Sequence, residues 1–111
     1  MLKLRWNCVE TTSLCSKIGN IAYADHTSKT AYQLPLTGFE TGNYWTALMY
    51  IQTGASAYGI YLVFLNTSDA VFVTKIAGTS DISFSGTRSG NALNLTASST
   101  VWGGIRALTM N

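Results

Sequence analysis

The sequence predicts an all-β domain, an antiparallel β-sandwich or meander with an extended connector at its N-terminal side. Its apolar runs are short, rich in β-branched and aromatic residues, and separated by Gly, Asn and Ser turns. No stretch repeats its apolar residues at the helical period of about 3.6 residues. Expected strand starts follow one another at intervals of about eight to fourteen residues, which is typical of antiparallel sandwiches.

The composition predicts one domain with a partner on part of its surface. The chain has 111 residues, enough for a single core. Charged residues make up 11% of it and hydrophobic residues 47%, whereas about 25% of an average soluble domain is charged. A surface with so few charges is expected to be covered in part, most simply by another copy of the chain.

Residues 1–36 are expected to form an extended connector with short strands, and residues 37–111 the β-sandwich domain. Residues 2–9 are compatible with a short strand. Residues 16–36 are rich in Ala, Ser and Thr and show no clean period of 2 or 3.6. Their small side chains would allow several chains to run close together.

From residue 44 onward the strand pattern is clear. The segments expected to be strands are 44–53, 57–66, 70–76, 81–85, 91–97 and 100–109. Turn-forming residues separate them, including Asn66 to Asp69 and Gly86 to Gly90. Gly103 and Gly104 are expected to mark a bulge or a close approach of chains within the last strand.

Alternation within the strands predicts which faces are buried. In 91–97, Leu93 and Leu95 point one way and Asn94 points the other, so one face is wet. The strands 44–53 and 57–66 are apolar on both faces. A domain of this size has one core, so we expect one of these faces to lie against another subunit. The residues assigned to that interface are Leu48, Tyr50, Ile60, Leu62 and Phe64; the sequence leaves open which face it is, and whether loops of the same chain cover it instead.

Charge and hydropathy argue against nucleic-acid and membrane partners. The net charge is +2, and the basic residues are scattered rather than clustered on one stretch. The longest strongly apolar run, at about residues 57–65, is too short to cross a bilayer. Residues 1–9 lack the apolar core of a signal peptide.

The sequence predicts no metal site and no cofactor. The two cysteines, Cys8 and Cys15, can pair as a disulfide across a short hairpin or remain two free thiols, as expected in a reducing cytosol. His26 is the single histidine, so a four-ligand zinc site is not expected.

Catalysis is not predicted either. The acids Glu10, Asp25, Glu40, Asp69 and Asp81 fall in expected turns or loops with no clear pairing. Asp25 and His26 are adjacent on an extended segment, where neighbouring side chains point apart, so Asp25 is not expected to orient His26.

Binding through loops is easier to support, because aromatic, Ser, Asn and Gly residues together provide rigid contact area and adaptable hydrogen bonds. The residues assigned to receptor binding are Tyr44, Tyr58, Arg88, Asn91 and Trp102. Arg88 stands out because its planar guanidinium offers several donors. For the aromatic residues the alternative is packing in the core or the subunit interface, and for Arg88 it is simple solvation.

The Ala-rich stretch 20–36, followed by 58–78, 81–84 and 91–108, resembles the connector and C-terminal head of bacteriophage and prophage tail fibres. The resemblance implies a homotrimer in the virion tail, made in the bacterial cytoplasm, whose distal loops bind a surface glycan or an outer-membrane protein of the host. Some fibre tips carry His-x-His iron sites, and this sequence has no such pair.

Two other functions stay open from the sequence. One is a monomeric carbohydrate-binding module or bacterial adhesin domain, which the mass in solution would separate from a trimer. The other is a hydrolase, for which the residues offer little support.

Overall fold

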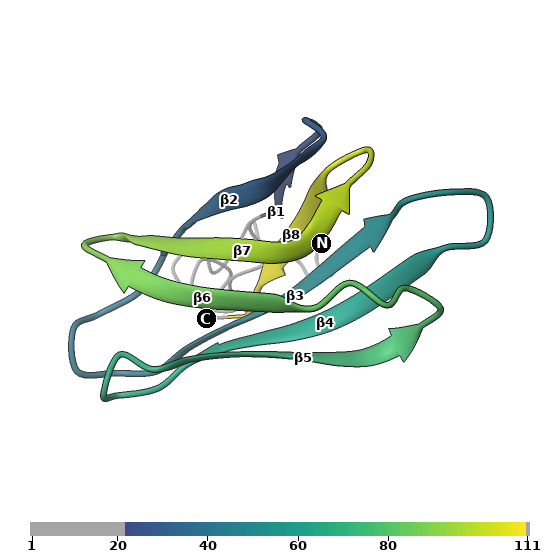
Figure 1. The fold of residues 1–111 in the computed structure, drawn as a ribbon. Helices are drawn as coiled ribbons and strands as arrows, with labels where there is room; N and C mark the ends of the chain where they lie inside the picture. The colour runs from purple at the N-terminus through teal and green to yellow at the C-terminus, as the bar shows by residue number, and fades with distance from the viewer. Residues whose placement is uncertain (1–21, 111) are drawn as a thin grey trace, which may run out of the picture.

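The computed structural model describes residues 22–110, and these form two stacked antiparallel sheets, which confirms the predicted all-β sandwich (Figure 1). The larger sheet has five strands in the order β1-β8-β3-β4-β5, and the smaller has three in the order β2-β7-β6. The strands are β1 (Ala22–Asp25), β2 (Lys29–Pro35), β3 (Trp45–Gln52), β4 (Tyr58–Leu65), β5 (Val71–Gly78), β6 (Phe84–Ser89), β7 (Ala92–Val101) and β8 (Ile105–Thr109).

The core lies between the sheets and follows from strict alternation along the central strands. On β3, Trp45, Ala47, Met49 and Ile51 are buried while the residues between them are not. On β7 of the other sheet, Leu93 and Leu95 are buried between partly exposed Asn94 and exposed Thr96. Successive side chains on a strand point to opposite faces, so these buried sets must face one another.

Residues 22–36 belong to the sandwich, and this corrects the expected boundary at residue 37. The segment is extended, as expected, but β1 pairs with β8 and β2 pairs with β7. Tyr32, Leu34 and Leu36 are all buried in the core. These three apolar residues alternate with polar or exposed ones, which is the pattern of a strand with one buried and one solvent-exposed face. Residues 22–36, expected to be a connector, therefore contribute two strands and three core side chains to the sandwich.

The last two strands also differ from expectation. The sequence placed a break near residues 98–99 and a continuous strand through Gly103 and Gly104. Instead, β7 runs to Val101, and the glycines form the turn into β8, with φ values of 89° and 84°. Glycine suits this turn because residues with a side chain rarely adopt positive φ. The close approach lies within the chain: a Cβ on Gly104 would stand 1.8 Å from the backbone oxygen of Asp25.

The loops gather at two opposite ends of the sandwich, on the left and right of Figure 1. We call one the Gly90 end, which holds the loops 36–44 and 66–70 and the β6–β7 turn. Hydrogen bonding of Leu36 N to Asn91 O joins two of these loops. The other, the Gly103 end, holds the loops 26–28, 53–57 and 102–104, where Gly103 N donates to Ser28 Oγ at 3.0 Å.

Candidate binding surfaces

All five residues assigned to a subunit interface lie on the outer face of the five-stranded sheet, the face turned away from the core. Leu48 stands opposite Leu62, and Tyr50 stands opposite Ile60, on the paired strands β3 and β4. Their chain neighbours on both strands are the buried residues of the core. The structure thus brings the five together on one surface and decides which of the two apolar faces is turned outward.

The apolar character continues onto the neighbouring strands. Phe72 on β5 stands opposite Phe64, and Leu108 on β8 stands opposite Leu48. Phe72 is 54% exposed, Tyr50 47% and Leu108 39%. Among the strand residues that the described pairing places on this face, Arg106 carries the only formal charge. Apolar side chains therefore continue from β5 across β4 and β3 to β8 on this face.

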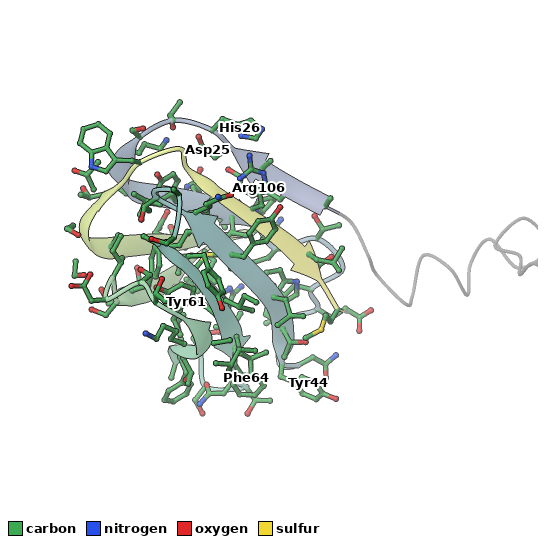
Figure 2. All side chains as sticks on the ribbon, turned by 90° about the vertical axis from the view of Figure 1, so that its right-hand side faces the viewer. Asp25, His26, Tyr44, Tyr61, Phe64 and Arg106 are labelled. Atoms are coloured by element: carbon green, nitrogen blue, oxygen red, sulfur yellow. The ribbon has the colours of Figure 1, made fainter. Side chains whose placement is uncertain are left out.

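A groove of about 740 Å³ crosses this outer face toward the Gly103 end. Its walls include Leu48, Ile60 and Leu108, with Arg106 at one side. The Arg106 guanidinium lies 5.7 Å from the centre of the Tyr50 ring, and its Nη2 lies 3.3 Å from His26 Nδ1. Figure 2 shows His26 and Arg106 together at the top of the molecule, far from Tyr44 and Phe64 at the bottom.

Asp25 and His26 do not work as a pair. The Asp25 carboxylate accepts hydrogen bonds from the hydroxyl and the backbone N–H of Thr27, and it lies 3.0 Å from Lys29 Nζ. These contacts lower the pKa of Asp25 from 3.8 to about 2, with the Thr27 hydroxyl contributing most, then the Thr27 N–H and Lys29. His26 turns to Arg106 instead. The Asp25 contacts therefore join residues of the turn between β1 and β2.

The outer face of the three-stranded sheet is polar. Thr87, Asn94 and Gln33 stand side by side across its three strands, and Gln33 Nε2 donates to Asn94 Oδ1 at 3.1 Å. The next row pairs Ser85 with Thr96. The outer face of the larger sheet is therefore the more apolar of the two.

The residues assigned to receptor binding are divided between the two ends. Tyr44, Arg88 and Asn91 lie at the Gly90 end. Tyr58 and Trp102 lie at the Gly103 end, beside the loops that follow β3 and β7. They cannot form one contact site, because the length of the strands separates the two groups. Trp102 is the most exposed large apolar residue at its end, at 64%.

Arg88 is engaged within the domain. Its Nη1 lies 2.8 Å from Asp69 Oδ1, its Nε donates to Gly90 O at 2.9 Å, and its guanidinium stacks 4.8 Å from the centre of the Phe39 ring. The side chain is 17% exposed. These contacts join the loops 36–44 and 66–70 to the β6–β7 turn, so Arg88 holds the Gly90 end together.

A second hollow, of about 400 Å³, opens beside Tyr44 at the Gly90 end and is named here the Tyr44 pocket. It is lined by Gly38, Glu40, Asn43, Tyr44, Thr46 and Met110. Tyr44 is 61% exposed, and its ring stacks on that of Phe64 with the ring centres 6.1 Å apart. Sequence reasoning selected Tyr44 but missed Glu40. The glycines at 38 and 42, both with positive φ, were the local signal for a tight loop that turns Glu40 back toward Tyr44.

Other features bear on the remaining predictions. Within residues 22–110, no three His, Cys, Asp or Glu side chains gather as a metal site would require. No helix in that part of the chain is long and apolar enough to span a membrane. Cys8 and Cys15 lie outside the described residues, so the question of their pairing stays a prediction.

Comparison of the chain with protein-family models, with curated proteins and with solved structures found no match.

Proposed function

We propose that this chain is a non-catalytic domain of a bacteriophage or prophage tail fibre that trimerises through the outer face of its five-stranded sheet and attaches the virion to a bacterial surface receptor. The observation that supports the proposal most strongly is the contrast between the two outer faces. One is dominated by Leu48, Ile60, Leu62 and their apolar neighbours, whereas the other carries mainly Ser, Thr, Asn and Gln side chains with the smaller Ala31, Pro35 and Ala92 among them.

The size of the apolar face fits a partner of the same chain. At about 4.8 Å between strands and about 3.3 Å per residue, the five strands span on the order of 500 Å² of sheet plane, and side-chain relief adds to this. That approaches the roughly 800 Å² that each partner buries in an interface of standard size. Burying it would remove Phe72, Tyr50 and Leu108 from water, each now more than a third exposed.

Three copies around a common axis follow from the resemblance to tail-fibre heads. In such an arrangement the apolar sheet faces meet at the axis, while both loop ends and the polar face of the three-stranded sheet remain in water. The scarcity of charge in the chain, 11% of residues, agrees with a surface of which a large share is covered.

The test is the mass in solution, measured by light scattering during size-exclusion chromatography. We expect three times the 12.0 kDa of one chain. Leu62→Asp places a charge in the centre of the apolar face and should give a folded monomer, because an unpaired charge cannot be buried cheaply. Thr96→Asp, on the outer face of the other sheet, is the matched control and should remain a trimer. A monomeric parent protein at high concentration would refute the trimer.

A second candidate function is a monomeric carbohydrate-binding module or adhesin domain. The Tyr44 pocket favours it, since a concave site with an exposed aromatic ring and polar groups is usable without partner chains. A monomeric parent protein that binds glycan would select this candidate.

A further inference from the structure

We propose that the Tyr44 pocket binds an uncharged sugar ring, and that Glu40 makes it select against acidic sugars. This rests on the proposed function, since it names the chemistry of the receptor that such a domain would bind. Four features of the pocket support it: a fixed loop, an aromatic platform, a carboxylate–amide pair and the sign of the charge.

The loop that forms the pocket is held in place by its own hydrogen bonds. Asn43 N donates to Glu40 O at 3.0 Å, and Phe39 N donates to Leu36 O at 3.2 Å. Trp45, fully buried, donates from its Nε1 to Thr37 O at 3.0 Å and anchors the loop to the core. The stacking of Arg88 on Phe39 fixes it from the other side. A loop ordered before binding loses little entropy when a ligand arrives.

The Tyr44 ring provides a flat apolar platform. Tyr44 is 61% exposed and its ring stacks on that of Phe64, and the Phe72 ring lies tilted beside Phe64 with the ring centres 6.4 Å apart. Successive ring planes differ by 30° and 32°, so the three rings form one aromatic cluster that supports Tyr44. The C–H face of a pyranose ring is apolar and of similar width, and a rigid tyrosine offers it contact area at low entropic cost.

Beside the platform stands a pair of groups suited to hydroxyls. Asn43 Nδ2 donates to Glu40 Oε1 at 3.2 Å, which orients the amide and the carboxylate toward one another. The carboxylate can accept hydrogen bonds from two neighbouring sugar hydroxyls, and the amide oxygen accepts a third. The pocket volume of about 400 Å³ lies in the range of small-molecule sites.

Charge decides which sugars fit. The residues that line the pocket include one carboxylate, Glu40, and no basic side chain. The nearby cation Arg88 is already paired with Asp69. A uronic or sialic acid would bring a second negative charge into the pocket, so neutral hexoses are favoured. The pocket adjoins the proposed interface, because Tyr44 rests on Phe64 and Thr46 stands opposite Phe64 on the same face. Sugar binding and association are therefore measured separately for each variant.

The experiment measures binding of neutral hexose oligosaccharides, and of their uronic- and sialic-acid counterparts, to the full chain by ligand-observed NMR and titration calorimetry. We expect the parent protein to bind neutral sugars only. Tyr44→Ala should weaken that binding about tenfold or more, and Tyr44→Phe, which keeps the ring, should retain it. Glu40→Gln should narrow the difference between neutral and acidic sugars. Trp102→Ala, at the opposite end, is the control and should bind as the parent does.

Failure of this inference and failure of the trimer have different signatures. If the parent protein is a trimer but binds no neutral sugar, the pocket is overturned and the association stands. The same holds if the Tyr44→Ala variant binds neutral sugar as well as the parent does. Loss of binding in Trp102→Ala also overturns it, because it moves the site to the Gly103 end. A monomer that binds neutral sugars through Tyr44 upholds the pocket and overturns the trimer.

Discussion

At the scale of single residues, Gly104 is the position where the fold tolerates no side chain. Its φ is +84°, and a Cβ would stand 1.8 Å from Asp25 O and 2.7 Å from His26 Cα, both backbone atoms that cannot move aside independently. Gly42 has a similar φ of +90° with nothing within 4 Å of a Cβ. Substitution at Gly42 therefore tests only the cost of a side chain at positive φ, whereas substitution at Gly104 adds the steric clash with the backbone of residues 25 and 26.

We predict that Gly42→Ala lowers the free energy of unfolding by about 1–2 kcal/mol, the cost of a left-handed residue. Gly104→Ala should lower it by about 3 kcal/mol or more, because β8 must also move away from β1. Urea unfolding followed by fluorescence of the buried Trp45 measures both. Equal losses in the two variants would show that the close approach at Gly104 is relieved without cost.

Single residues also show what the sequence could and could not predict about the site. Alternation in the sequence grouped the five residues of β3 and β4 apart from Trp45 and its neighbours, but it left open which group faces outward, and the structure places the five on the outer face. It could not place Arg88, whose partners Asp69 and Phe39 lie 19 and 49 positions away in the numbering. The residues around Arg88 in the sequence do not distinguish a solvent-exposed arginine from one that contacts three loops.

At the scale of elements, the turn between β1 and β2 depends on one ionised group. Asp25 is held by Thr27 and Lys29, and its pKa is lowered to about 2 in the folded protein. A depressed pKa means that the contribution to stability is fully present above pH 4 and is lost as the pH falls toward 2. The turn is thus expected to weaken in acid.

The predicted outcome is a fall in the urea midpoint of the parent protein between pH 4 and pH 2 that is smaller in Asp25→Asn. The amide keeps the shape of the carboxylate but has no proton to bind, so the two proteins should differ most at neutral pH and converge near pH 2. Parallel curves over this range would mean that the Thr27 and Lys29 contacts do not stabilise the fold.

The strands differed in how well the sequence predicted them. β3 and β4 were clear, because bulky β-formers fill both faces. For β1 and β2 the sequence predicts only an extended connector with short strands, because their Ala and Thr residues hide the period. The alternation of Tyr32, Leu34 and Leu36 was the available signal, and Pro35 between them is compatible with the edge strand that β2 proves to be.

At the scale of the whole molecule, the proposed association is apolar and should behave accordingly. Leu48, Tyr50, Ile60, Leu62 and Phe64 carry no charge, and Arg106 is the only charge that the described strands place on their face. Salt weakens ionic interfaces, because at physiological ionic strength it screens the interaction between exposed charges more than about 8–10 Å apart. Salt does not weaken the burial of apolar surface in this way.

We therefore predict that sedimentation equilibrium gives the same trimer population, or a slightly larger one, when sodium chloride is raised about tenfold from near 0.05 M. The Leu62→Asp variant should stay monomeric throughout. Dissociation of the parent trimer by salt would point to a charged interface elsewhere on the molecule.

The arrangement of the loops was beyond the sequence for a topological reason. Tyr44, Tyr58 and Trp102 each sit beside a strand end, and local chemistry makes them equivalent. Which end of the sandwich each residue occupies depends on the direction in which β2, β3 and β7 run within their sheets. Pairing between strands far apart in the sequence fixes those directions.

The pairing of β1 with β8 has a mechanical consequence. Ala22 stands directly opposite Leu108, so the first and last strands of the sandwich begin and end at the same edge. A force that separates Ala22 from Leu108 would load the hydrogen bonds between β1 and β8 one after another, in unzipping geometry. It would not load them all at once, as a shear force does. Under tension the first rupture is therefore expected there, while the β3–β4 centre of the sheet still holds.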